Sequence, residues 1–561
     1  MEEVQEKTTV AVVGLGGMGI AAVKNLIEEG FEVTGFDKSP YYGGLWHFTE
    51  DKETLSILEC KPTSLDNPHK PTYPLNEQVT WLLHPVASPN TLLQMCYTDF
   101  PFPEDTPTHC SAGEVQKYIE SYVEHFCLAP HFRLNTTVTH ISESEETGRW
   151  RIDIAGAPSQ NFDKVVMATG PHVKATPFRL EGQEVFEGEV MHSQRFKRAS
   201  DYAGKRVVVL GMGNTSADIA NELVGVASKV YLSHNRGAHV LPRDLKGVPA
   251  TSVLTHRLIR LQSFIDRLFP RLRDLLSGLV LHRMTSTVFG ALDPAWGLLP
   301  APPATVTNPI INDALIPHLR SGALLSVPGI RRLVGPSAIE LVSGAIIHAD
   351  VVVCCVGYQN NYHDILSPRV DPTRHLSAAW DAAPGARGRP LPRLYQNVFS
   401  LDRPDSLAFV GCAWFATGAL TVADLASMCI AQVWRGRSRL PPAETMEAWM
   451  DAQEGYVARL ARRGTVVPAT VDMRAWLVWA DETAGMGVER RVGRWCGWES
   501  WAFWWRERRL HAMIEAGVFT SVVWRLFPGS KSKAWEGARR EIERLNERHE
   551  EKLAAYKRSH S

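Results

Sequence analysis

The chain has few cysteines, almost no net charge and no long uncharged hydrophobic run. Its nine cysteines in 561 residues are scattered, without C-x-x-C or zinc-ligand spacing, as is typical of reduced thiols inside cells. A formal net charge of −1 gives no reason to expect nucleic acid as a partner. No stretch reaches about eighteen uncharged apolar residues, which argues against a spanning helix. The acidic N-terminus excludes a secretory signal, so we expect a cytoplasmic protein.

A glycine-rich turn between a β-branched strand and a helix occurs twice. The first copy occupies residues 10–19 and the second occupies residues 207–218. In this context the G-x-G-x-x-G pattern indicates a dinucleotide, because glycines let the backbone approach a pyrophosphate that the helix N-terminus attracts. Two copies predict an α/β protein with two Rossmann-like domains, which passes electrons between two bound dinucleotides.

The first glycine turn is predicted to bind FAD or NAD. Asp37 ends the next strand, where a carboxylate accepts a hydrogen bond from a ribose 2′-hydroxyl and would repel a 2′-phosphate. A double glycine followed by Trp46 comes soon after and permits a further close approach of backbone and cofactor. The candidate residues for this cofactor are Gly14, Leu15, Gly16, Gly17, Met18, Gly19, Asp37, Lys38, Gly44, Leu45 and Trp46.

The second glycine turn is predicted to bind NADPH. No acid follows its next strand at residues 229–233, and Arg236 lies there instead. A guanidinium pairs bidentately with a 2′-phosphate, which favours NADPH over NADH; the alternative is that Arg236 is an ordinary surface charge. The candidate residues are Gly211, Gly213, Asn214, Thr215, Ser216, Ala217, Asp218 and Arg236.

The order of strands and turns predicts one domain interrupted by another. Apolar strands that end in glycine recur at residues 165–170, 349–357 and 407–411. We therefore expect an FAD-binding domain at residues 1–177 and 329–440 and an inserted NADPH-binding domain at 178–328. Residues 441–561 are charged and rich in tryptophan, which predicts a mostly helical C-terminal extension that ends in one charged helix.

Two segments leave the interaction partners open. Residues 254–285 interleave leucines and phenylalanines with arginines, and tryptophans cluster at 495–505 just before Arg506, Arg508 and Arg509. Both patterns are typical of segments that rest on a membrane surface. We favour a helix packed on its own domain for the first segment, and packing over the flavin domain or an oligomer contact for the second. The sequence is therefore compatible with peripheral membrane contact and with oligomerisation.

A third motif connects the chain to a known family. Residues 186–196 have the pattern F-x-G-x-x-x-H-x-x-x-F, and further motifs lie at residues 99–105, 309–313 and 356–358. Over residues 8–440 the chain resembles the class B flavin-containing monooxygenases, of the dimethylaniline monooxygenase type. Phe196, followed by Lys197, is similar to the branch that oxygenates nitrogen and sulfur. We interpret His192 as a residue of the domain junction, with a satisfied core histidine as the alternative.

The resemblance implies an FAD- and NADPH-dependent monooxygenase. In that family NADPH reduces FAD, O₂ adds to the flavin C4a atom, and the hydroperoxide gives one oxygen atom to a small-molecule amine or sulfide. The family places an asparagine near the flavin, and the nearest candidate is Asn90, one residue closer to the motif at 99–105 than expected, so Pro89 is the alternative.

Other functions stay open. One alternative is a Baeyer–Villiger or carbon-oxygenating flavin monooxygenase, because the substrate's pose decides the product. Another is a nucleotide-binding scaffold protein that uses the tryptophan-rich end for interactions. A disulfide reductase is disfavoured because it needs a redox-active cysteine pair, and none has the required spacing.

Overall fold

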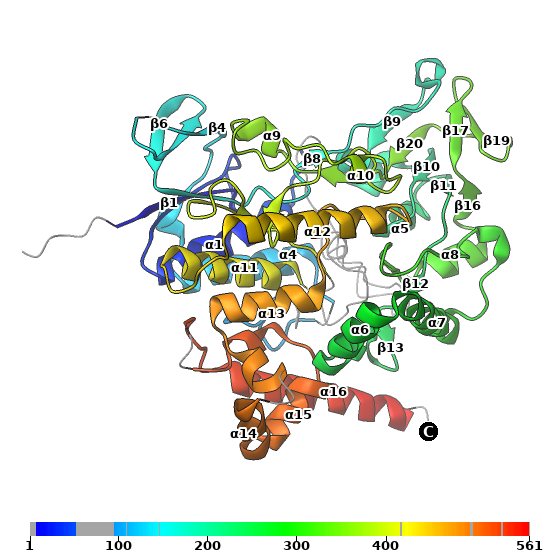
Figure 1. The fold of residues 1–561 in the computed structure, drawn as a ribbon. Helices are drawn as coiled ribbons and strands as arrows, with labels where there is room; N and C mark the ends of the chain where they lie inside the picture. Colours follow the sequence, from blue (N-terminus) through cyan, green and yellow to red (C-terminus); the bar gives the residue numbers. More distant parts are fainter. Residues whose placement is uncertain are drawn as a thin grey trace, which may run out of the picture.

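The computed structural model describes residues 7–51, 95–107, 109–144, 146–415, 418–493, 497–528 and 531–559. One parallel sheet lies on the left of Figure 1 and a second on the upper right, with helices between and below them. The C-terminal helices lie in the lower half of this view. They are α13 (Met473–Ala484), α14 (Trp498–Arg506), α15 (Arg508–Ala516) and α16 (Ala538–Ser559).

The first sheet contains the first glycine turn. Its strand order is β22-β23-β24-β7-β1-β2-β3, and β1 pairs in parallel with β2 and β7. Helix α1 (Gly17–Glu28) follows β1, which confirms the helix predicted after the first glycine turn, and it packs on α11 (Ala419–Trp434). The strands are β1 (Thr9–Val13), β2 (Glu32–Phe36), β3 (Phe132–Arg133), β7 (Lys164–Met167), β22 (Leu394–Tyr395), β23 (Phe399–Ser400) and β24 (Leu407–Phe409).

The second sheet contains the second glycine turn. Its strand order is β16-β11-β10-β20-β9, and α5 (Asn214–Leu223) follows β10. The strands are β9 (Glu189–His192), β10 (Arg206–Leu210), β11 (Lys229–His234), β16 (Leu325–Pro328) and β20 (Val351–Cys354).

One predicted boundary is wrong. Strand β20 lies in the segment 329–440 that we assigned to the FAD-binding domain, but it pairs with β10 of the second sheet. All four of its residues are fully buried, and a run of buried valines does not reveal which of two sheets it joins. The chain therefore returns to the first sheet after Cys354. The remaining domain boundaries stay predictions.

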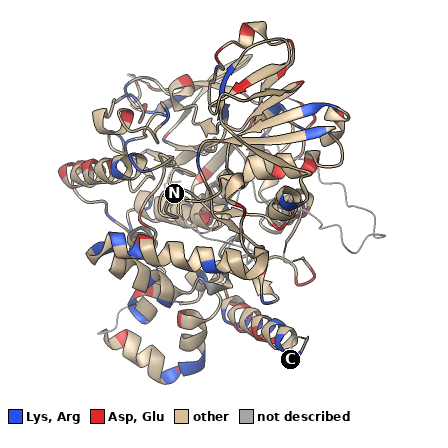
Figure 2. Ribbon diagram, turned by 90° about the vertical axis from the view of Figure 1, so that its right-hand side faces the viewer, with Lys and Arg blue, Asp and Glu red and all other residues tan. Residues whose placement is uncertain are grey.

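Helices outside the sheets largely follow the predicted pattern. Helix α4 (Ala112–His125) begins with a capping box between Ser111 and Glu114. The predicted segment at 254–285 forms two consecutive helices, α6 (His256–Leu268) and α7 (Pro270–Phe289). In Figure 2 acidic and basic residues are mixed along α16, which leads to the label C. No helix in the described ranges combines the length and hydropathy that crossing a bilayer requires.

Candidate functional site

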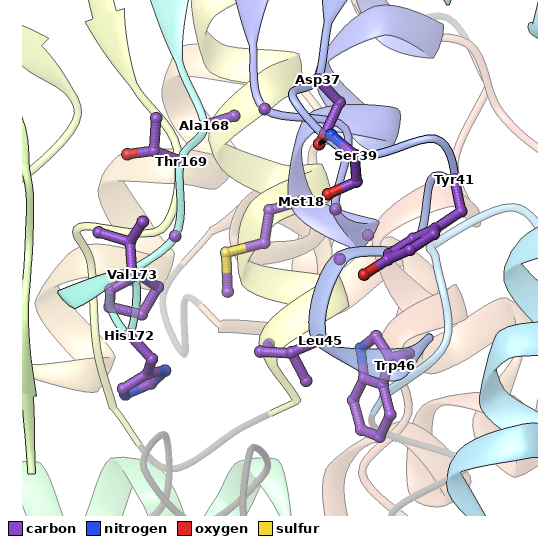
Figure 3. A pocket seen from close by; sticks show the side chains of 18 of the residues that line it. Met18, Asp37, Ser39, Tyr41, Leu45, Trp46, Ala168, Thr169, His172 and Val173 are labelled. Atoms are coloured by element: carbon purple, nitrogen blue, oxygen red, sulfur yellow. Dashed lines mark hydrogen bonds between the residues drawn. The ribbon is translucent and has the colours of Figure 1, made fainter. Parts of the chain in front are cut away.

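The first glycine turn, the end of β2 and the turn after β7 line one cavity (Figure 3). These segments follow neighbouring parallel strands, whose carboxyl ends meet at one edge of the sheet. Most candidates for the first cofactor are therefore brought together. Its lining includes Gly14, Gly16, Gly17, Met18, Asp37, Lys38, Ser39, Tyr41, Gly44, Leu45, Trp46, Thr169, His172 and Val173.

Two candidates for the first cofactor do not line this cavity. Leu15 is fully buried in the core. Gly19 lies where α1 crosses the turn, and a Cβ there would be 1.9 Å from the carbonyl oxygen of Gly14. Gly19 thus allows close packing of helix and strand and does not face the cavity.

The backbone around this cavity fits a pyrophosphate. Gly14 has a φ of +102°, and a Cβ on it would lie 2.5 Å from the carbonyl oxygen of Ala168. Helix α1 has no side-chain cap and no acid in its first turn. Its first N–H groups therefore point to the cavity end of the helix without a competing carboxylate, as anion binding requires.

Asp37 has a second role that the sequence did not reveal. Its Oδ2 accepts a hydrogen bond from the N–H of Leu15 at 2.8 Å, and its Oδ1 accepts one from the N–H of Ser39 at 2.9 Å. The carboxylate therefore braces the glycine turn against the end of β2. Each carboxylate oxygen has capacity for a further hydrogen bond, so Asp37 can still accept one from a ribose hydroxyl.

His172 is a cavity residue that sequence reasoning missed. It follows β7 after the turn Gly170-Pro171 and is only 7% exposed. Its Nδ1 has no hydrogen-bond partner among the described residues. Burial lowers the pKa of His172 to about 4, so the ring is neutral at physiological pH. The strand that ends in glycine at 165–170 was the signal that could have located it.

The second glycine turn lines a larger cavity of about 570 Å³. Gly213 has no atom within 4 Å of an added Cβ, so the space beside it is open to a ligand. The predicted residues Gly211, Gly213, Asn214, Thr215, Ser216 and Arg236 all line this cavity, together with Tyr358, Arg387, Arg389 and Trp414. The described lining contains three arginines and no carboxylate, which suits a polyanionic ligand.

Part of the second candidate set faces inward. Ala217 is fully buried, and Asp218 accepts a hydrogen bond from the Nδ2 of Asn312 at 3.2 Å. Neither residue lines the cavity. Successive side chains of an α-helix point in different directions, and those of Ala217 and Asp218 lie on the side of α5 that faces the protein interior. Ser216 caps α5, because its Oγ accepts a hydrogen bond from the N–H of Gly213 at 2.8 Å.

The three arginines of the second cavity differ in what holds them. Arg389 is buried and donates to the carbonyl oxygens of Ala386 and Gly385 at 3.0 Å each. The guanidinium of Arg387 has no ion-pair or hydrogen-bond partner among the described residues. Desolvation and then the charge of nearby Arg236 lower the pKa of Arg387. Arg387 and Arg236 thus repel one another unless an anion lies between them.

The two cavities meet at three aromatic rings. His172 of the first cavity lies 5.6 Å, centroid to centroid, from Tyr358 of the second, and Tyr358 lies 4.9 Å from His192. The Nε2 of His192 lies 3.0 Å from the carbonyl oxygen of Gly357, and its Nδ1 accepts from the N–H of Gln194 at 3.1 Å. Burial lowers the pKa of His192. These contacts support a junction role for His192 and leave neither nitrogen free to act as a base.

Asn90 and its alternative Pro89 lie outside the described residues. The predicted asparagine beside the flavin therefore stays a prediction.

Comparison with known proteins decides the family. The model of the family described as "Flavin-binding monooxygenase-like" matches residues 7–59 and 76–559. The chain belongs to this family. Monooxygenase aurF of Gibberella zeae is 37% identical over 543 residues, covering 96% of this chain and 97% of the relative. Flavin-containing monooxygenase 1 of Oryctolagus cuniculus is 30% identical over 455 residues, covering 78% and 76%.

Solved structures of flavin monooxygenases share the fold. S-allyl-L-cysteine S-oxygenase from Allium sativum has a TM-score of 0.55 at 19% identity, covering 85% of this chain and 88% of its own. Cyclohexanone monooxygenase from Rhodococcus sp. Phi1, bound to NADP+, has a TM-score of 0.58 at 18% identity, covering 86% and 98%. The predicted α/β fold with parallel Rossmann-like sheets is confirmed. The protein is a flavin-dependent monooxygenase.

Proposed function

We propose that this flavin-containing monooxygenase transfers one atom of O₂ to a nucleophilic nitrogen or sulfur of a small molecule. The observation that carries the proposal is a pair of cavities that meet at His172 and Tyr358, one lined by Asp37 and Lys38 and the other by Arg236 and Arg387. This arrangement suits electron transfer from a phosphorylated nicotinamide dinucleotide to a flavin.

Two observations favour nitrogen or sulfur over a carbonyl carbon as the acceptor. The fingerprint ends in Phe196, which stacks on Tyr202 with ring centroids 5.1 Å apart, whereas Baeyer–Villiger members usually have tryptophan there. A human relative named dimethylaniline monooxygenase [N-oxide-forming] 4 is 26% identical over 554 residues, covering 95% of this chain.

The proposed assignment of one cofactor to each cavity follows from the charged residues that line the two cavities. FAD would be held in the first cavity by the turn Gly14–Gly16–Gly17, by the N-terminus of α1 and by Asp37. NADPH would be held in the second cavity by the N-terminus of α5 and by Arg236 and Arg387, whose charges suit its 2′-phosphate. In both cavities the binding groups are backbone N–H donors and charges that the fold has already oriented.

When bound, FAD and NADPH supply the hydride transfer and the activation of O₂. The protein orients the reactants and limits water. Met18, Leu45 and Trp46 give the first cavity apolar walls, and Trp46 is only 4% exposed. His172, neutral because of its lowered pKa, adds no charge to this wall, and its unpartnered Nδ1 is available for one hydrogen bond there.

The test is a substrate panel with isotopically labelled dioxygen. N,N-dimethylaniline and methyl phenyl sulfide should stimulate NADPH oxidation and give products that carry one labelled oxygen atom. Cyclohexanone should do neither. A labelled lactone from cyclohexanone, with no N-oxide or sulfoxide, would establish the Baeyer–Villiger alternative, and a protein that binds both cofactors but consumes no O₂ would favour the scaffold alternative.

A further inference from the structure

Helix α7 is apolar on two opposite faces, and its own domain covers only one of them. Leu281 and Met284 are buried against Leu241 and Ile311. The other face carries leucines and a valine at positions i, i+3, i+4, i+7 and i+8, which align along one side of a helix. They are Leu272 (44% exposed), Leu275 (61%), Leu276 (43%), Leu279 (58%) and Val280 (57%).

Two further helices carry exposed apolar side chains. On α6, Leu261, Phe264 and Leu268 are 52%, 63% and 52% exposed. Helix α15 contacts both α6 and α14, and these helices all lie in the lower half of Figure 1. On α14, Trp498 is 83% and Trp505 is 69% exposed. We call the exposed side chains of α6, α7 and α14 the apolar–arginine face.

Unpaired positive charge accompanies this apolar surface. Arg257, Arg267, Arg271 and Arg283 are exposed, and none has an acidic partner among the described residues. The two acids of the hairpin are already engaged: Asp266 lies 3.6 Å from Arg273, and Asp274 pairs with Arg463. Arg508, the first residue of α15, stacks over Trp504 and Trp505 of α14 at 4.7 Å from each ring. The face therefore combines hydrocarbon, indole rings and a net positive charge.

We propose that the apolar–arginine face docks this enzyme on a bilayer that contains anionic lipids. Leucine and tryptophan side chains enter the boundary between headgroups and acyl chains, while the interleaved arginines contact lipid phosphates and carboxylates. So many exposed apolar side chains along one helical hairpin are unusual in a monomer that has no partner.

Charge selects the lipid surface over a second copy of the chain. A symmetric dimer places the same patch on both sides of its interface, so the arginines of one copy would face those of the other with no free carboxylate of the patch between them. An anionic bilayer instead offers the opposite charge over the whole face. The helices lie flat on it, since none in the described part of the chain is able to span it.

Vesicle flotation tests the proposal with the full-length, FAD-loaded protein. Binding to phosphatidylcholine vesicles that contain about one third phosphatidylserine should be strong at low ionic strength and weaken in about 0.5 M salt, which screens the arginines. Vesicles of phosphatidylcholine alone should bind much less. Replacing Leu275 and Leu279 together by asparagine should weaken binding at least tenfold. Replacing Arg271 and Arg283 by glutamine should weaken it about tenfold and flatten the salt dependence.

The matched control is Leu376→Asn, which changes a 90% exposed leucine outside the face and should bind like the parent. Flavin absorbance verifies that every variant is folded, and it does not depend on the substrate proposed above. The proposal would be overturned if neither the double leucine substitution nor the double arginine substitution changed vesicle binding. The proposal would also be overturned if the parent protein formed a concentration-dependent dimer and did not bind anionic vesicles, and if the Leu275/Leu279 double variant were monomeric.

Discussion

Single side chains distinguish the two cavities at the residue scale. Asp37 faces the first cavity while bracing Leu15, and Arg236 with Arg387 faces the second. A 2′-phosphate is repelled by the first arrangement and attracted by the second. The proposed placement of FAD and NADPH therefore depends on a few charged side chains that follow the strand ends.

Removing either free arginine should reduce the preference for NADPH. A charge-assisted hydrogen bond to phosphate contributes about 1.5–3 kcal/mol. We expect Arg236→Ala and Arg387→Ala each to raise the KM for NADPH about ten- to hundredfold. Steady-state kinetics with NADH provide the internal control, because NADH lacks the 2′-phosphate and its KM should stay constant. Equal losses with both dinucleotides would mean that these arginines only support the fold.

Two glycine substitutions should separate the cofactor sites. In Gly14→Ala the new Cβ would lie 2.5 Å from the carbonyl oxygen of Ala168 at a φ of +102°, so the turn must distort and the protein should lose FAD. In Gly213→Ala the Cβ enters open space beside the second turn. That variant should keep its flavin absorbance and bind NADP+ more weakly in titration calorimetry. Full flavin occupancy in Gly14→Ala would contradict the proposed first site.

Local spacing allowed part of the site to be predicted. The glycines, Asp37 and Arg236 lie at fixed offsets from strand ends, so one βαβ unit reveals them. Ala217 and Asp218 belong to the same motif but face the protein interior, and spacing alone does not distinguish the two sides of a helix end. Arg387 reaches the second cavity from a distant segment, which no local pattern reveals. His172 directly follows the strand that ends in glycine at 165–170, so its position had a signal in the sequence.

At the scale of elements, strong periodicity was a reliable guide. The helix predicted after the second glycine turn is α5 (Asn214–Leu223), and the terminal charged helix is α16 (Ala538–Ser559). Strand β20 was assigned to the wrong sheet because both sheets are built from similar buried valine runs. The hairpin α6–α7 shows a further limit, since one amphipathic pattern contained both a buried and an exposed apolar face.

The contact between α6 and the C-terminal extension should weaken in acid. His256 at the start of α6 packs on Phe519 with ring centroids 4.6 Å apart. Burial, with the charges of Arg260 and Arg474, lowers the pKa of His256 to about 3. The unfolded chain therefore binds a proton near its ordinary pKa of about 6.5 while the folded chain does not, so stability from this group is complete above that pH and falls as the pH falls towards 3.

His256→Phe should remove this pH dependence while keeping a ring in the same place. From pH 7 to pH 5 the parent should lose about 2 kcal/mol more unfolding free energy than the variant. Urea denaturation followed by tryptophan fluorescence at both pH values measures the difference. Identical losses in parent and variant would show that His256 does not titrate on unfolding.

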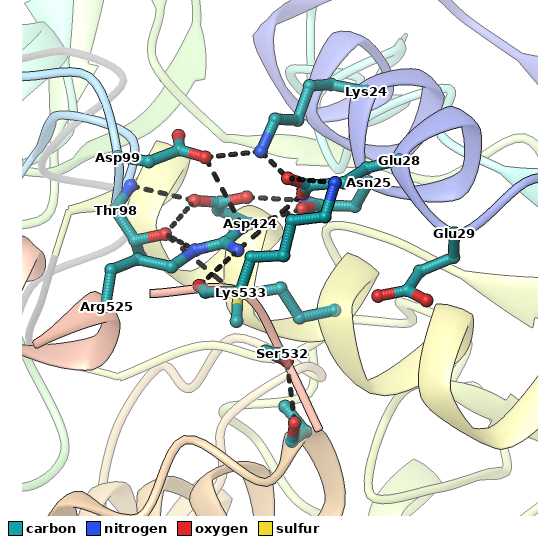
Figure 4. A network of polar contacts seen from close by, with 12 residues as sticks. Lys24, Asn25, Glu28, Glu29, Thr98, Asp99, Asp424, Arg525, Ser532 and Lys533 are labelled. Atoms are coloured by element: carbon teal, nitrogen blue, oxygen red, sulfur yellow. Dashed lines mark hydrogen bonds and ion pairs between the residues drawn. The ribbon is translucent and has the colours of Figure 1, made fainter. Parts of the chain in front are cut away.

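The whole molecule is held together by a buried polar network that joins its two ends (Figure 4). Arg525, 2% exposed, donates to the Oγ1 of Thr98 and the Oδ1 of Asn25 at 2.9 Å each, and lies 3.5 Å from Asp99. Burial alone would raise the pKa of Asp99, but Arg525 and Lys24 outweigh it and lower that pKa. The C-terminal extension is thus part of the core around α1, and its role here could not be predicted from residues so far apart in the chain.

Breaking this network should destabilise the entire fold. Arg525→Met leaves buried carboxylates with too little compensating charge, which typically costs about 3–5 kcal/mol. The matched control is Arg509→Met, because the Arg509–Glu547 pair is exposed on both sides and such pairs contribute less than about 1 kcal/mol. Thermal unfolding should show a large drop in midpoint for the first variant only. Comparable midpoints for the two variants would mean that the extension is not part of the core.

The central claim is that two dinucleotides meet at His172 and Tyr358, so that NADPH reduces the flavin of the same chain. Anaerobic mixing of the FAD-loaded protein with NADPH or NADH in a stopped-flow instrument tests it most directly. We expect NADPH to bleach the visible flavin absorbance at least tenfold faster than NADH at equal subsaturating concentration, and O₂ to restore it. A protein that stays colourless with excess FAD, or a bound flavin that NADPH does not bleach, would contradict the account.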